Sequence, residues 1–262
     1  MPTTVQSILS PIIKGQNTTT ITPNWMQGRA TFGGLTVGIA VADMINALPE
    51  PRPLKSLMVS FVAPIGEGDI QASSQLLRVG KSVAQVQTTL SHNDGPPALV
   101  VLGAFGHDRP TKSVMDETPF TPKPLADTHP MPARATGLPA FMQNFEVRWV
   151  QGIPTTATND TRLGMWVRHR DGADIPPLTR LIIAADIPPP IMMAHYDRPI
   201  MGSSLSWSLE LLVDEDAMAG DWLYLDYQLE QAQGGYQVQS GRIYAENGTL
   251  LALSRQCMVY FE

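Results

Sequence analysis

The segment GLTVGIAVADM, residues 34–44, recurs in altered form as PLTRLIIAADI, residues 177–187. Aligned without gaps, the two segments share five of eleven residues, whereas composition alone would give about one. The identical pairs are Leu35/Leu178, Thr36/Thr179, Ile39/Ile182, Ala42/Ala185 and Asp43/Asp186. We expect a helix over residues 34–48 and another over residues 177–186, and in the first of them Gly34, Gly38 and Ala42 recur every four residues, along one helical face. The repeat therefore predicts two copies of one fold in a single chain.

A second pair of segments supports this duplication. TTLSHNDGPPALVVLGAFG, residues 88–106, resembles GRIYAENGTLLALSRQCMVYF, residues 241–261. Both patterns predict a strand, a tight turn and a second strand, with Asp94-Gly95 and Asn247-Gly248 at the turns. Other predicted strands follow each predicted helix, such as KSLMVSFVAPI, which contains β-branched residues, and WLYLDYQLE, whose residues alternate with a period of two. One helix against several antiparallel strands is an α+β arrangement, and we expect it twice.

The segment HDRPTKSVMDETPFTPKPLADTHPMPARATG, residues 107–137, separates the two copies. It is rich in proline and threonine and lacks hydrophobic periodicity, which predicts an extended linker. We therefore assign residues 1–110 to the first copy, 111–140 to the linker and 141–262 to the second copy. The two sheets are expected to pair edge to edge, because an unpaired sheet edge attracts another strand.

Composition excludes several functional classes. The 262 residues are 43% hydrophobic and 16% charged, a balance typical of a folded globular protein. The net charge of −6 and the absence of a basic run argue against binding to nucleic acid or to an anionic membrane surface. A single cysteine, Cys257, excludes an internal disulfide, and the five histidines show no metal-ligand spacing. The start of the chain lacks the pattern of a secretory signal and no apolar run reaches ~18 residues, so we expect a cytoplasmic protein without metal or cofactor.

Several short motifs resemble the acyl-CoA thioesterase II family and its thioesterase-like relatives. They are TFGGL (31–35), RPLKSL (52–57), LRVGKS (77–82) and, near the end of the chain, GTLLALSRQ (248–256). The resemblance implies a double hotdog fold, in which each of two tandem units wraps an antiparallel sheet around a helix. It also implies hydrolysis of a fatty acyl-CoA thioester to the free acid and CoA, without a covalent intermediate.

The resemblance further implies that an Asp, a Ser or Thr and a Gln hold the attacking water. Carried over to this sequence, the acid is Asp186, the amide is Gln256 and the hydroxyl is Ser204, with Ser203 or Ser206 as alternatives. This chain has Ser206-Trp207 where the family usually has Asp-His, which affects the substrate class more than the fold.

Elementary chemistry is consistent with these roles. Water attacks a thioester carbonyl only if a base removes its proton and donors stabilise the oxyanion. Asp186 follows an apolar run, which would raise its pKa, and Gln256 and Ser204 can hydrogen-bond a water. Gly33 and Gly34 begin the first predicted helix, where backbone N–H groups favour negative charge, and we expect them to contact the substrate together with Phe32.

Simpler interpretations remain open at this point. Asp186 could be a solvated helix end, although an acid at a helix C-terminus is unfavourable to the helix dipole. Asp43 occupies the same place in the first copy, but its helix continues beyond it. Gln256 could face solvent.

Two other functions fit the fold class: a hydratase or dehydratase of acyl thioesters, and a non-catalytic acyl-CoA or lipid-binding protein. We also expect a homo-oligomer, whose order the sequence does not fix.

Overall fold

A computed structural model describes residues 3–92, 95–115, 120–128, 130–131, 137–172, 174–218 and 220–262. The α-helices of these segments are α1 (Val5–Ile13), α2 (Gly33–Ala47) and α3 (Pro177–Ala185). The strands before the linker are β1 (Thr18–Ile21), β2 (Met26–Gln27), β3 (Ala30–Thr31), β4 (Leu54–Phe61), β5 (Gly68–Val79), β6 (Val83–His92) and β7 (Leu99–Gly106). The strands after it are β8 (Phe145–Gln151), β9 (Arg162–His169), β10 (Met201–Leu211), β11 (Leu223–Gln233), β12 (Tyr236–Ala245) and β13 (Leu250–Phe261).

Eleven of these strands form one antiparallel sheet in the order β1-β5-β6-β7-β4-β10-β13-β12-β11-β9-β8. The two halves meet at β4 and β10, which pair in register with Leu57 opposite Leu209. On each side of this junction the strand order is the same, read outward: β4-β7-β6-β5-β1 and β10-β13-β12-β11-β9. The structure thus confirms the predicted α+β double hotdog and its continuous sheet.

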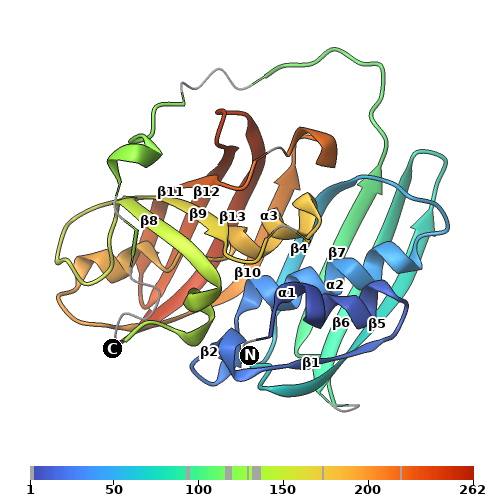
Figure 1. Ribbon diagram of the computed structural model, residues 1–262, viewed down its shortest axis with the longest axis horizontal. Helices are drawn as coiled ribbons and strands as arrows, with labels where there is room; N and C mark the ends of the chain where they lie inside the picture. The colour runs from blue at the N-terminus through green and yellow to red at the C-terminus, as the bar shows by residue number, and fades with distance from the viewer. Residues whose placement is uncertain are drawn as a thin grey trace.

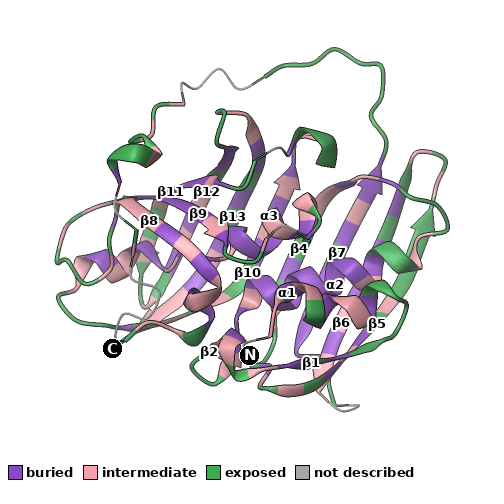
Figure 2. Ribbon diagram, viewed as in Figure 1, coloured by how far each residue is buried: buried purple, intermediate pink, exposed green. Residues whose placement is uncertain are grey.

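Helices α2 and α3 lie side by side against one face of the curved sheet (Figure 1). Both are buried along most of their length (Figure 2), since they face the sheet on one side and each other on another. Glycine allows the close approach: a Cβ at Gly38 would lie 2.8 Å from Ile183 Cγ1. The small residues spaced by four in the first repeated segment therefore form a helix-helix contact.

Residues 120–128 of the linker pack on the opposite face of the second half. Strand β11 shows the two faces, because Leu225 and Tyr227 point into the main core and Tyr224 points away from it. Phe120 of the linker contacts Tyr224, with 5.9 Å between the ring centroids, and Trp166 Nε1 donates to the carbonyl of Lys123 at 3.0 Å. This part of the linker is thus bound to the outer face of the sheet, whereas residues 111–115 are exposed.

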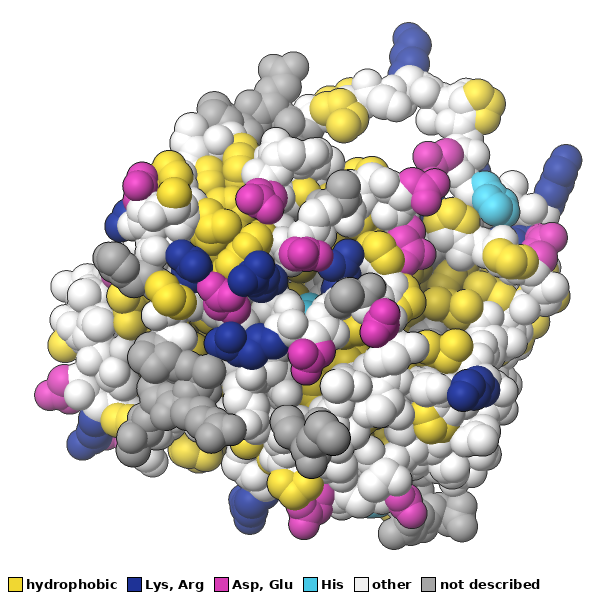
Figure 3. All heavy atoms as spheres, viewed as in Figure 1, with side chains coloured by type: hydrophobic (Ala, Val, Ile, Leu, Met, Phe, Trp, Pro, Cys, Tyr) yellow, Lys and Arg dark blue, Asp and Glu magenta, His cyan; other side chains and the backbone are white. Residues whose placement is uncertain are grey.

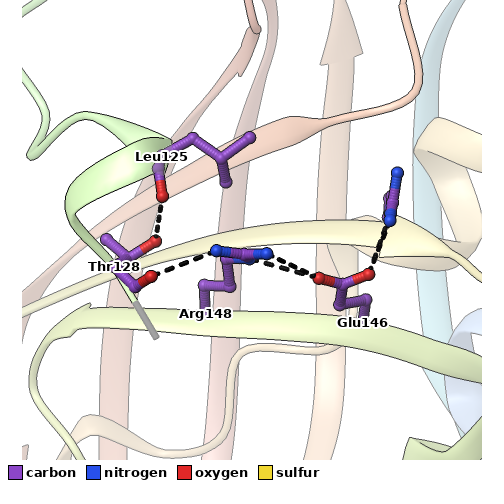
Figure 4. A network of polar contacts seen from close by, with 5 residues as sticks. Leu125, Thr128, Glu146 and Arg148 are labelled. Carbon is purple, nitrogen blue, oxygen red and sulfur yellow. Dashed lines mark hydrogen bonds and ion pairs between the residues drawn. The ribbon is translucent and has the colours of Figure 1, made fainter. Parts of the chain in front are cut away.

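Polar contacts hold the end of this segment. Arg148 Nη1 donates to the carbonyl of Thr128, while Glu146 pairs with both Arg148 and Arg168 (Figure 4). On the face seen in Figure 3, basic side chains lie beside acidic ones.

The turn predicted at Asn247-Gly248 joins β12 to β13. Gly248 adopts φ 90° in the β12–β13 turn, and Thr249 N donates to Asn247 Oδ1 at 3.0 Å, as the sequence predicted for that turn. Asp94 of the other predicted turn lies outside the described residues. Helix α1 was not anticipated from the sequence. None of the helices in the described residues is long and apolar enough to cross a membrane.

Candidate active site

The carboxylate of Asp186 lies where the C-terminus of α3 meets the N-terminus of α2. Asp186 is the C-cap residue of α3, and the chain leaves the helix there because three prolines follow Ile187. Its Oδ1 accepts a hydrogen bond of 2.8 Å from Gln256 Nε2, and the carboxylate also accepts one from the backbone N–H of Gly34. Asp186 is therefore bound to two other elements and is not a solvated helix end.

Burial raises the pKa of Asp186 from its ordinary 3.8 to about 7, against the opposing effect of the hydrogen bonds from Gly34 and Gln256. The residue as a whole keeps partial exposure. Its carboxylate is thus desolvated but remains close to the surface. A carboxyl group with this pKa can both accept and release a proton at neutral pH, which is the requirement for a general base that later acts as an acid.

The start of α2 supplies the other wall of the site. A Cβ at Gly33 would lie 2.5 Å from Asp186 Oδ2 and 2.9 Å from Phe61 Cε1, so only glycine fits without displacing one of them. Because α2 belongs to the first half and α3 to the second, neither half forms this site alone.

Gln256 is fully buried on β13, on the face that carries the helices. Its Nε2 donates to Asp186, and its Oε1 accepts a hydrogen bond of 3.0 Å from Gln239 Nε2 on β12. The alternative of a solvent-facing Gln256 is therefore wrong.

The register of β10 against β13 separates the three candidate serines. Ser204 pairs with Met258, which lies two residues from Gln256 and therefore shares its face of the sheet. Ser203 pairs with Val259 and Ser206 with Cys257, both on the opposite face. A bulge between Ser204 and Ser206 produces this assignment by shifting the alternation by one residue. Of the three, Ser204 is the serine whose side chain is directed to the Gln256 side.

Two domain families match the chain. Residues 21–106 match the acyl-CoA thioesterase N-terminal domain, and residues 121–260 match the acyl-CoA thioesterase C-terminal domain. The chain belongs to the acyl-CoA thioesterase family. No curated protein sequence matches it.

Solved structures agree with the fold of this thioesterase family. A conserved protein with a hotdog fold from Alicyclobacillus acidocaldarius is similar at 20% identity and a TM-score of 0.84, covering 94% of this chain and 92% of that one. An acyl-CoA thioesterase II from Mycobacterium marinum is similar at 18% identity and a TM-score of 0.72, covering 93% and 92%.

The first half of the chain does not repeat the arrangement of polar groups at the site. Asp43 is the counterpart of Asp186, but it lies within α2 and accepts a hydrogen bond of 2.6 Å from Ser74 Oγ. The counterpart of Gln256 is Gly103, since the two occupy the same place after the aligned turns. Only the second half therefore combines an acid at a helix end with a buried amide.

Phe32 is buried at the start of α2. Its ring is 1% exposed and stacks on Phe141, with 4.0 Å between the centroids and 1° between the planes. It also meets Phe145 edge to face at 5.9 Å. The ring is part of the core and packs where α2 begins, and its expected contact with substrate stays a prediction.

Two residues near the site were missed in the sequence. Gln237 and Gln239 are buried on β12, on the same face of the sheet as Gln256 of β13. The signal was the alternation in YQVQ, residues 236–239, where two amides occupy the positions that should face the core.

Ser204→Ala should lower kcat/KM by roughly 10- to 100-fold if this hydroxyl holds the attacking water, since one hydrogen bond in the reacting geometry is lost. Ser203→Ala and Ser206→Ala are matched controls on the opposite face and should leave the rate within about twofold. Steady-state hydrolysis by the three variants decides the point. A larger loss in either control than in Ser204→Ala would assign the hydroxyl elsewhere.

Proposed function

We propose that the protein hydrolyses acyl-CoA thioesters to a free acid and CoA, with Asp186 activating a water molecule directly. The observation that carries the proposal is the buried carboxylate with a pKa of about 7, held between Gly34 N–H and Gln256 Nε2. Membership of the acyl-CoA thioesterase family supports the reaction class.

In the proposed mechanism, the Asp186 carboxylate removes a proton from water while the water oxygen bonds to the thioester carbon. Collapse of the tetrahedral intermediate breaks the carbon–sulfur bond, and protonated Asp186 returns the proton to the CoA thiolate. Ser204 and Gln256 orient the water. The N–H of Gly33, in the first turn of α2 where no intrahelical acceptor exists, is the proposed oxyanion donor, because Gly34 N–H is already bonded to Asp186.

Hydrolysis of a panel of acyl-CoA substrates tests this function directly. Saturated acyl-CoAs from short to long are incubated with the wild-type protein, and the release of free thiol is followed. We expect hydrolysis of at least one chain length. Binding of acyl-CoA without thiol release across the whole panel would reject the proposal in favour of a non-catalytic binding protein.

The pH dependence gives a second test, with a definite sign. Asp186 acts as a base only when ionised, so kcat/KM should rise with pH and reach half of its plateau near pH 7. At pH 6 the rate should be about tenfold below the plateau. The decrease in thioester absorbance measures this without a pH-sensitive thiol reagent. A profile that stays flat down to pH 5 would show that an ordinary carboxylate, or no carboxylate, limits the reaction.

A further inference from the structure

Three buried glutamines form a chain of hydrogen bonds that ends on Asp186. Gln237 Nε2 donates to Gln239 Oε1 at 2.7 Å, Gln239 Nε2 donates to Gln256 Oε1 at 3.0 Å, and Gln256 Nε2 donates to Asp186 Oδ1 at 2.8 Å. All three glutamines are at most 1% exposed. We call Gln237, Gln239 and Gln256 the glutamine relay.

The direction of the relay is fixed at its far end by the backbone. Met192 N donates to Gln237 Oε1 at 3.0 Å, and Ile191 N donates to Gln239 Oε1 at 3.3 Å. A backbone N–H can only donate, so each of these amides must present its oxygen there and its NH₂ to the next residue. Gln256 consequently receives an N–H on its oxygen and must direct its own NH₂ to Asp186.

We propose that Gln239, supported by Gln237, is a positioning residue for the proposed hydrolysis: it holds the Gln256 amide with its N–H, and not its carbonyl, toward Asp186. An amide is nearly symmetric in shape and can otherwise rotate by half a turn at little steric cost. An N–H toward Asp186 stabilises the ionised base. A carbonyl in its place would repel the carboxylate and accept a hydrogen bond from the protonated acid. The inference rests on the proposed function for its catalytic consequence only.

The two halves of the protein show that the fold does not require the relay. The counterparts of the relay on β6 and β7 are Ala84, Val86 and Gly103, by register of the aligned strands. Ala84 and Val86 are fully buried, so the first half fills the same space with apolar or small side chains. The three buried amides of the second half are therefore not required to fill this part of the core.

Few other groups can influence the protonation of Asp186. The groups that face it are Gly34 N–H from α2, Gln256 from β13 and Tyr227 from β11. Burial raises the pKa of Tyr227, and its hydroxyl donates to the carbonyl of Ala185 at 2.9 Å, so it stays neutral. No other charged group contributes to the pKa of Asp186 among the described residues. Gly34 donates from a backbone that cannot turn, which leaves Gln256 as the partner with two orientations.

The experiment is a pH titration of Asp186 in Gln239→Met. Carbon NMR of protein labelled at its Asp carboxyl groups monitors the titration. The Asp186 signal is identified by its loss in Asp186→Asn. Methionine keeps the length of glutamine but cannot donate to Gln256, so the midpoint should rise by about one pH unit above that of the wild type. Gln228→Met, an exposed glutamine on β11, is the matched control and should leave the midpoint unchanged.

A double-mutant cycle separates positioning from general damage. If Gln239 acts through Gln256, then Gln239→Met should shift the midpoint in the wild-type background and not in a Gln256→Ala background. An unchanged midpoint in Gln239→Met, or an equal shift in both backgrounds, would overturn the proposal. If Gln239→Met does not fold, Gln239→Asn, whose shorter side chain cannot reach Gln256, is read with the same two criteria.

Kinetics provide the functional measurement. In Gln239→Met, kcat/KM at pH 7 should fall by about fivefold with KM nearly constant, because a rise of about one pH unit leaves roughly one tenth of Asp186 ionised at pH 7, and the acidic limb should move with the NMR midpoint. A loss confined to KM would contradict a positioning role. If the wild type hydrolyses no acyl-CoA, the proposed function fails, while the NMR titration still decides whether the relay sets the protonation of Asp186.

Discussion

Asp186→Asn is expected to reduce acyl-CoA hydrolysis by roughly 100- to 10,000-fold while the protein stays folded. Asparagine has almost the same shape as aspartate, and its Oδ1 can still accept from Gln256 Nε2. It cannot accept a proton from water. Free-thiol release measures the rate, and thermal unfolding of the same sample measures the fold.

Asp43→Asn is the matched control for this variant. Asp43 occupies the same place in the repeated helix, but it lies in the first half of the chain, where it contacts Ser74. It should keep hydrolysis within about twofold of the wild type. Retention of activity in Asp186→Asn, with or without an effect at Asp43, would remove Asp186 as the base.

The same carboxylate has a calculable effect on stability. The pKa of Asp186 is higher in the folded protein, about 7, than its ordinary 3.8, so the folded state binds the proton more tightly between these values. Its contribution to the free energy of unfolding is therefore most favourable below pH 4 and is lost as the pH rises through 7. Asp186→Asn should remove this dependence, and its unfolding temperature at pH 8 should not fall below that of the wild type. An ionised Asp186 thus lowers the stability of the folded protein.

The fold could be predicted from the sequence because its decisive signals are local. The repeated segment gave both helices to within a residue or two, and it placed Asp186 at a helix end, with α3 ending at Ala185. The turn at Asn247-Gly248 was likewise readable, since only a few residue types accept the conformation of Gly248. Periodicity and turn chemistry depend on neighbours in the chain, which the sequence displays directly.

The site was only partly predictable because it depends on strand register. One bulge in β10 decides whether Ser203, Ser204 or Ser206 shares a face with Gln256, and no residue in that serine-rich run marks the bulge. The glutamine relay joins β12 to β13 and to the backbone after α3, which are contacts between distant segments. The stacking of Phe32 on Phe141 was unpredictable for a similar reason, since the two residues lie more than 100 residues apart in the chain.

Gly34→Ala should lower the melting temperature by roughly 5–10 °C, the effect of about 2–3 kcal/mol in a protein of this size. A Cβ at Gly34 would overlap the backbone carbonyl oxygen of Ile183 in α3 and would also meet the ring of Phe32. Because a carbonyl held within a helix cannot rotate away, α2 and α3 must separate. Differential scanning calorimetry measures the loss.

Gly38→Ala is the matched control one turn further along the same helix. Its Cβ would also meet Ile183, but the nearest atom is the side-chain Cγ1 at 2.8 Å, which can move by rotation of the side chain. Alanine is preferred to glycine within a helix by about 1 kcal/mol, which offsets part of the crowding, so Gly38→Ala should stay within about 3 °C of the wild type. Equal melting temperatures for the two variants would mean that the helices can adjust their separation freely. It would also mean that the helix spacing does not fix the hydrogen bond from Gly34 N–H to Asp186.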